Sequence, residues 1–111
     1  MQHRARKRFG QNFLTDGSVI SRIVDTVAPR AGELVLEIGP GQAALTIPLA
    51  DSGADLHLLE IDRDLAARLE VQFATRDNVT VHVGDALKMD FGEITDGRPF
   101  RLVGNLPYNI S

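Results

Sequence analysis

A short polar segment follows the last apolar run of the chain and has the residue types of a working site. Residues 100–103 are expected to form a buried strand, and the residues Asn105, Leu106, Pro107 and Tyr108 come directly after it and a glycine. An amide, a stiff proline and an aromatic ring at the mouth of a strand suggest a binding or catalytic loop. The alternative is an ordinary strand end with a turn proline and a core tyrosine.

An earlier glycine turn has the pattern of a nucleotide-binding loop. Gly39, Pro40 and Gly41 follow an apolar run at residues 34–38, and Ala44 completes the pattern G-x-G-x-x-A. Glycine lets the backbone bend and lets a ligand approach closely, as in dinucleotide-binding proteins. A plain strand-to-helix turn has the same appearance. The turn lacks the G-K-[ST] ending of a phosphate-binding loop.

Three acidic residues stand at or near the ends of expected strands. Glu60, 21 residues after Gly39, could accept hydrogen bonds from both ribose hydroxyls of NAD or of S-adenosylmethionine, or could be a surface acid. Asp85 could accept a hydrogen bond from an adenine amino group, or cap a loop. Glu37 could hold loop amides or face a cationic ligand, and because it would repel a pyrophosphate it argues against a dinucleotide.

The apolar pattern predicts the elements that position these residues. Strands are expected at residues 34–38, 55–61, 79–83 and 100–104. One helix begins after a cap at Asp16 or Ser18, a second runs from the glycine turn to about Asp51, and a third contains Leu65 and Leu69. Residues 86–97 are expected to be a loop with one short helix at most.

Alternating strands and helices predict an α/β fold with a parallel sheet. Right-handed crossovers bring the carboxyl ends of the strands to one edge, where ligands of such sheets bind. The four strands end in EIGPG, LEID, GDAL and GNLPY, so their polar residues are expected to converge there.

Composition limits the classes of site. The 111 residues include no cysteine, which excludes disulfides and thiolate metal sites, and His3, His57 and His82 lack metal-ligand spacing, so no metal is expected. No apolar run is long enough to span a membrane and the N-terminus lacks a signal-peptide core, which predicts a cytoplasmic protein without membrane contact.

The N-terminus is a basic arm on an acidic body. The basic residues Arg4, Arg6, Lys7 and Arg8 have no acid among them, whereas the rest of the chain has eight basic and fifteen acidic residues. This asymmetry indicates either contact with a polyanion or a solvated tail.

Five motifs in order resemble one family. QNFL at 11–14, EIGPGQAALT at 37–46, LEID at 59–62, GDAL at 84–87 and NLPYNIS at 105–111 are similar to the S-adenosylmethionine-dependent ribosomal RNA adenine dimethyltransferases. Pro40 and Leu106 favour the small-subunit enzymes of that family. The resemblance implies a Rossmann-like class I methyltransferase fold, with an incomplete parallel sheet and flanking helices.

The resemblance also implies site residues. Asn12 and Leu14 close over the methionine part of the cofactor, Glu60 takes the ribose hydroxyls and Asp85 the adenine amino group. The implied cofactor-binding set is Gln11, Asn12, Leu14, Glu37, Gly39, Gly41, Glu60, Ile61, Asp85, Ala86 and Asn105.

The closing motif then acquires a catalytic interpretation. The side-chain oxygen of Asn105 and the backbone carbonyl of Leu106 accept the two N–H bonds of an adenine amino group, which favours the tetrahedral nitrogen needed for attack on a methyl group. Pro107 holds the loop, and Tyr108 stacks on the extruded base, worth roughly 1–3 kcal/mol. The implied product is N(6),N(6)-dimethyladenosine, at two adjacent adenosines near the 3′ end of small-subunit ribosomal RNA.

Residues 1–15 are expected to be a basic arm and cofactor-covering loop, in which the arginines and lysine contact RNA phosphates, and residues 16–111 the N-terminal part of a methyltransferase domain. Because family members continue with further strands and a small helical domain, the chain is expected to be a truncated and inactive form of a monomeric enzyme that acts on the assembling small ribosomal subunit. It could associate through the open edge of residues 100–104. The alternatives are a non-catalytic RNA-binding or assembly module and an NAD-dependent oxidoreductase.

Overall fold

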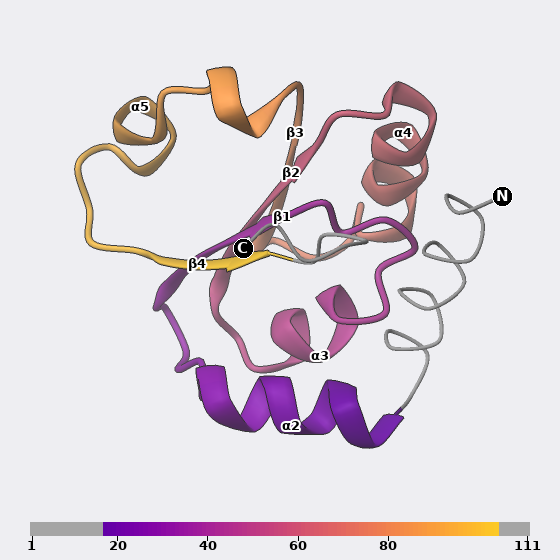
Figure 1. Ribbon diagram of the computed structural model, residues 1–111, viewed down its shortest axis with the longest axis vertical. Helices are drawn as coiled ribbons and strands as arrows, with labels where there is room; N and C mark the ends of the chain where they lie inside the picture. Colours follow the sequence, from indigo (N-terminus) through magenta and orange to yellow (C-terminus); the bar gives the residue numbers. More distant parts are fainter. Residues whose placement is uncertain (1–16, 105–111) are drawn as a thin grey trace, which may run out of the picture.

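Four parallel strands form the sheet that the sequence predicts. The computed structural model describes residues 17–104, and within them the strands are β1 Leu34–Ile38, β2 Asp55–Glu60, β3 Val79–Val83 and β4 Arg101–Gly104. Their order in the sheet is β3-β2-β1-β4, and each neighbouring pair is parallel (Figure 1). The α/β class and all four strands are confirmed, with β2 and β4 each one residue shorter than expected.

Helices connect the strands. They are α2 Gly17–Val27, α3 Thr46–Asp51, α4 Arg63–Gln72 and α5 Phe91–Thr95, with a 3-10 helix η1 at Ala86–Lys88. Residues 86–97 therefore contain two short helical segments, where one at most was expected. Asp85 and Asp90 explain both, because their side chains accept hydrogen bonds from the backbone amides of Leu87 and Glu93. None of the helices described between residues 17 and 104 is long and apolar enough to cross a membrane.

Two helix boundaries differ from the prediction. α3 begins only at Thr46, because Ala43 has a φ of 73° and so leaves the helical region. Pro48 is compatible with that late start. It has no backbone N–H, and the N–H groups of a first helical turn have no acceptor within the helix. α2 begins at Gly17, so Ser18 lies inside the helix and does not precede it. The other expected cap, Asp16, lies outside the described residues.

The core lies on both faces of the sheet. On one face the strand residues Leu56 and Leu58 pack with Leu49 of α3 and Leu69 of α4, and half-buried residues of α2 join them. On the other face a smaller cluster of Leu34, Leu36 and Leu59 is covered by apolar residues from the segment 86–94. Figure 1 shows α2 and α3 together below the sheet and α5 on the opposite side.

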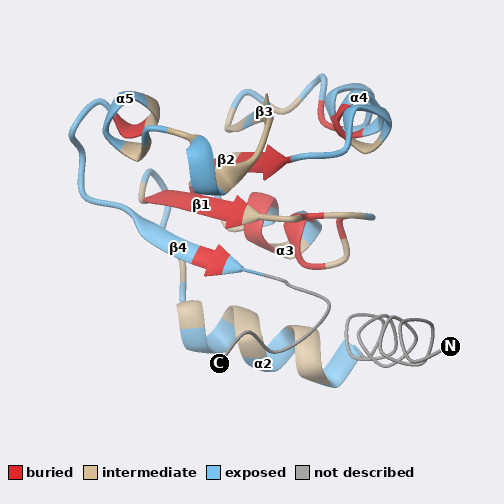
Figure 2. Cartoon of the chain, turned by 45° about the horizontal axis from the view of Figure 1, so that its top comes forward, coloured by how far each residue is buried: buried red, intermediate tan, exposed pale blue. Residues whose placement is uncertain are grey.

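β4 is not the buried strand that the sequence predicts. Leu102 is 51% exposed and Phe100 is 37% exposed, whereas Val103 is buried (Figure 2). Among the described residues β4 pairs only with β1, so a neighbouring strand shields it on one side alone. An apolar run identifies a strand but does not distinguish a central position from an edge.

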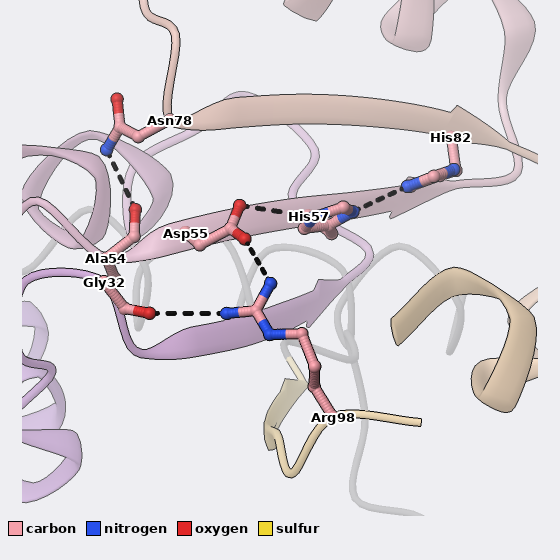
Figure 3. Close-up of polar contacts among 7 residues, drawn as sticks. All are labelled: Gly32, Ala54, Asp55, His57, Asn78, His82 and Arg98. Atoms are coloured by element: carbon pink, nitrogen blue, oxygen red, sulfur yellow. Dashed lines mark hydrogen bonds and ion pairs between the residues drawn. The ribbon is translucent and has the colours of Figure 1, made fainter. Parts of the chain in front are cut away.

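A polar network crosses the sheet from the segment before β4 to β3 (Figure 3). Arg98, just before β4, donates to Asp55 at 2.9 Å, Asp55 contacts His57 at 3.3 Å, and His57 contacts His82 of β3 at 2.9 Å. The sequence had given no reason to pair these histidines, which are 25 residues apart. Within residues 17–104, no three His, Cys, Asp or Glu side chains are grouped so that they could hold a metal ion.

Candidate functional site

The turns after β1, β2 and β3 lie side by side, as expected. The Gly39 amide donates to the carbonyl of Leu59 at 3.0 Å, and the Gly84 amide donates to the carbonyl of Glu60 at 2.9 Å. These bonds continue the strand register beyond the ends of the strands. The predicted residues Glu37, Gly39, Gly41, Glu60, Ile61, Asp85 and Ala86 are thereby brought to one edge of the sheet.

The glycine turn is fixed to the second strand. Gly39 and Gly41 have φ values of 68° and 58°, in the left-handed region that glycine adopts easily. The Gly41 amide donates to Glu60 Oε1 at 3.2 Å. Among residues 17–104, a Cβ at Gly41 would meet only the Gly39 carbonyl oxygen, at 3.9 Å, so within this part of the chain backbone conformation and not space calls for glycine at this position.

Glu60 has a structural role beside its predicted one. Its side chain is buried, with 4% exposed, and its Oε2 accepts the Asp62 amide at 3.0 Å while Oε1 accepts Gly41. Each carboxylate oxygen can accept a further hydrogen bond. The carboxylate therefore positions the turns after β1 and β2 and still has acceptor capacity for two hydroxyl groups.

Glu37 is fully buried and incompletely satisfied. Its Oε1 accepts the hydroxyl of Thr46 at 2.7 Å, and its Oε2 has no hydrogen-bond partner within the part of the chain that the structure describes. Burial raises the pKa of Glu37 to about 7, the Thr46 hydrogen bond opposes this rise, and the charge of Glu60 adds to it. A buried carboxylate oxygen without a donor fits a cationic ligand better than an anionic one.

Thr46 is a residue that sequence reasoning missed. It lies within the quoted motif at 37–46 but had no assigned role, and its hydroxyl takes the place of the loop amides that were one of two possible partners of Glu37. The only signal was a threonine nine residues after the acid, at the first turn of the helix. Its hydroxyl is what joins the end of β1 to the start of α3.

The third turn combines a capped helix with exposed apolar side chains. Asp85 Oδ1 accepts the Leu87 amide at 2.9 Å, so the capping interpretation of this residue is confirmed, and contact with an adenine stays a prediction. Ala86 packs against the smaller core cluster. Leu87 in this turn is 94% exposed, and Ile61 in the turn after β2 is 65% exposed, so this edge offers apolar surface beside its acids.

The remaining predicted residues lie outside residues 17–104. These are Arg4, Arg6, Lys7, Arg8, Gln11, Asn12 and Leu14 before α2, and Asn105, Leu106, Pro107 and Tyr108 after β4. β4 ends at Gly104, which is opposite Ile38 in the register of the sheet. The last described residue of β4 therefore lies at the same edge as the glycine turn.

Comparison with known proteins agrees with this geometry. The model of the ribosomal RNA adenine dimethylase family matches residues 2–111. Ribosomal RNA small subunit methyltransferase A of Aromatoleum aromaticum is 56% identical over 110 residues, which cover 99% of this chain and 40% of the relative. The chain thus spans about two fifths of the length of the curated relatives it matches.

Solved structures show the same fold. The 23S rRNA methyltransferase ErmE aligns with a TM-score of 0.71 at 35% identity, covering 86% of this chain and 37% of ErmE. A dimethyladenosine transferase from Plasmodium falciparum aligns with a TM-score of 0.69 at 25% identity, covering 86% and 34%. The fold is that of a Rossmann-like class I methyltransferase, and the chain belongs to the ribosomal RNA adenine dimethylase family.

Proposed function

We propose that this chain binds S-adenosylmethionine at the carboxyl edge of its sheet, as the N-terminal part of a ribosomal RNA adenine dimethyltransferase. The full-length protein would dimethylate the exocyclic amines of two adjacent adenosines near the 3′ end of small-subunit ribosomal RNA. The observation that carries the proposal is the hydrogen-bonded convergence of the turns after β1, β2 and β3, in a chain of this family.

The acids of the edge suit the parts of this cofactor. Glu60 would accept the ribose hydroxyls with its remaining acceptor positions, and Asp85 would accept the adenine amino group. Ile61 and Ala86 would flank the adenine ring, and the turn of Gly39 and Gly41 would lie against the methionine part of the cofactor. The buried carboxyl group of Glu37, whose ionised form a cation stabilises and an anion destabilises, favours a sulfonium over a pyrophosphate, which supports this cofactor over NAD.

The loop after β4 would carry the chemistry. This loop would begin at the edge where the cofactor would bind, because its first residue, Asn105, is bonded to Gly104. The side-chain oxygen of Asn105 and the Leu106 carbonyl would accept the two N–H bonds of the adenine amino group and aim the nitrogen lone pair at the methyl carbon. Pro107 would stiffen the loop and Tyr108 would stack on the base. The bound cofactor would supply the reactive methyl group.

RNA is the proposed partner. Arg4, Arg6, Lys7 and Arg8 would contact its phosphates, and residues 11–14, with Gln11, Asn12 and Leu14, would close over the cofactor. We place residues 1–15 in this arm and residues 16–111 in the methyltransferase domain. The relative in Aromatoleum aromaticum is named a ribosomal RNA small subunit methyltransferase, which supports small-subunit ribosomal RNA as the substrate. This RNA would be methylated within the assembling small subunit. The full-length form would be a cytoplasmic monomer that needs no metal.

A methylation assay tests the function. The chain at its natural length is incubated with labelled S-adenosylmethionine and undermethylated small subunits. We expect methyl transfer in the parent and its near-complete loss in Asn105→Ala, with cofactor affinity changed less than about threefold, since Asn105 would act on the amino group in the transition state. The Tyr108→Phe variant is the matched control: it alters the same loop but keeps the aromatic ring, so it should retain methyl transfer.

Two results would contradict the proposal. Calorimetry that gives tighter binding of NAD than of S-adenosylmethionine would support an oxidoreductase. RNA binding by the full-length parent without any methyl transfer would support a non-catalytic assembly module.

A further inference from the structure

Two buried carboxyl groups share the edge of the sheet. Glu37 near the end of β1 is 0% exposed and Glu60 at the end of β2 is 4% exposed. They are close enough for the charge of Glu60 to act on the ionisation of Glu37. In a buried setting two such charges repel strongly, so one of the two groups tends to hold a proton.

The hydrogen bonds decide which group holds the proton. Both oxygens of Glu60 accept backbone amides, from Gly41 and Asp62, and N–H donors stabilise the ionised form. Glu37 has one donor, the hydroxyl of Thr46, and its Oε2 is buried without a partner among the described residues. The ionised form of Glu37 is therefore less well stabilised than that of Glu60, and of the two groups Glu37 holds the proton, on Oε2.

We propose that Glu37 senses the charge of the ligand: it holds a proton in the unliganded site and releases it to solvent when a cationic ligand binds. This inference rests on the proposed function, in which the substrate form of the cofactor is a sulfonium and the product form has a neutral sulfur. A nearby positive charge favours the carboxylate, and by linkage the carboxylate favours the cation. Exchange of the cation for the neutral product returns a proton from solvent to Glu37.

The groups acting on Glu37 are few. Within residues 17–104 they are the hydroxyl of Thr46 on α3 and the carboxylate of Glu60 on β2. The two have opposite effects, because the hydroxyl favours the carboxylate and the negative charge disfavours it. A pKa of about 7 places the change in the pH range where binding is readily measured.

Calorimetry with S-adenosylmethionine and S-adenosylhomocysteine at pH 6 to 8 tests the inference, on the chain at its natural length. The two ligands share the amino-acid part, so its own titration cancels in the ratio of their affinities. We expect this ratio to shift about fivefold toward S-adenosylmethionine between pH 6 and pH 8, as the lowering of a pKa of about 7 by one unit would give over this range. Proton release, read from two buffers of different ionisation enthalpy, should accompany S-adenosylmethionine and be smaller for the homocysteine.

Two variants separate this role from a merely structural one. Glu37→Gln keeps an acceptor for Thr46 but cannot titrate, so the ratio should become independent of pH. Thr46→Val removes the hydroxyl donor, so the midpoint of the pH dependence should move to higher pH. If Glu37→Gln does not fold, the pH dependence of the affinity ratio in the parent, and its shift in Thr46→Val, still test the proposal.

The outcomes distinguish the charge-sensing role of Glu37 from the proposed function on which it rests. An affinity ratio that is constant with pH in the parent, or a pH dependence that persists in Glu37→Gln, overturns the charge-sensing role and leaves the cofactor assignment intact. Failure of the full-length parent to bind either ligand at any pH overturns the cofactor assignment and the charge-sensing role together.

Discussion

Nδ1 of His57 lies 2.9 Å from Nε2 of His82, and the two rings stack with their centroids 5.1 Å apart (Figure 3). His57 Nε2 also lies 3.3 Å from Asp55 Oδ1, within ion-pair distance of the carboxylate when the ring is protonated. In the neutral pair one of these two nitrogens, His57 Nδ1 and His82 Nε2, donates and the other accepts, and the tautomers of the rings set the direction. Full protonation of both rings would set two N–H donors against each other.

This pair predicts a loss of stability in acid. Burial, and then the neighbouring His57, lower the pKa of His82 below its ordinary value of 6.5. Below about pH 6.5 the unfolded chain therefore binds more protons, and the contribution of His82 is lost as pH falls from there through its folded pKa. His82→Gln keeps both a donor and an acceptor beside His57 and removes the titration. In urea unfolding at pH 5 and 7.5 it should lose less stability in acid than the parent, and an equal loss would refute the assignment.

Glu37 predicts the opposite dependence of stability on pH, namely a loss of stability as pH rises. Its folded pKa of about 7 lies above the ordinary 4.5, so its contribution is present below pH 4.5 and is lost as pH rises toward 7. Glu37→Gln should match the parent near pH 4.5 and exceed its unfolding free energy by roughly 2–3 kcal/mol at pH 8. Urea unfolding across this range measures the difference. Parallel curves for variant and parent would mean that Glu37 ionises normally.

Glu60 should matter for both the turns and the cofactor. In Glu60→Gln an amide N–H₂ faces a backbone amide, of Gly41 or Asp62, that now lacks its acceptor. We expect a loss of about 1–3 kcal/mol of stability and a decrease in S-adenosylmethionine affinity of at least about tenfold. Asp62→Ala is the control: Asp62 caps α4, so it should lose about 1 kcal/mol with little change in affinity. Equal losses of affinity would contradict a ligand role for Glu60.

Asn78 provides a purely structural comparison. Its Nδ2 donates to the carbonyl of Ala54 (Figure 3) and to that of Ala50, each at 2.9 Å, which joins the start of β3 to the end of α3 and the start of β2. Asn78→Ala should lower the free energy of unfolding by about 1–3 kcal/mol, because two carbonyls lose their donor. Cofactor affinity, corrected for the folded fraction, should be unchanged. A change in affinity at full folding would show coupling to the site.

The outer edge of β4 should support self-association of the 111-residue chain. Within the described residues this edge has no neighbouring strand, and Leu102 beside it is 51% exposed. A lysine opposes edge-to-edge pairing, so Leu102→Lys should shift sedimentation toward monomer. Val71→Lys, at a 79% exposed position on α4, is the control and should leave association as in the parent. Unchanged association in Leu102→Lys would exclude this edge.

Features that depend on neighbouring residues in the chain were determined by the sequence itself. The apolar runs gave all four strands, and the glycine turn occurred where Gly39 and Gly41 predict it. Asp62 caps α4 as its position before the helix suggests. Periodicity, caps and turn residues act over a few residues, so they can be recognised without knowing the neighbours in space. The motifs at 11–14 and 105–111 gave the site predictions that lie beyond the described residues.

Features that depend on contacts between distant segments were decided by the tertiary structure. The pairing of His57 with His82 and the contact of Thr46 with Glu37 arise because parallel strands and their connecting helix bring separate segments together. The exposure of Leu102 follows from the position of β4 in the sheet, which its own residues do not specify. Burial and pKa depend on everything packed around a group. The same glutamate in the same motif would therefore ionise normally on an open surface, and only the fold makes Glu37 a group that titrates near neutral pH.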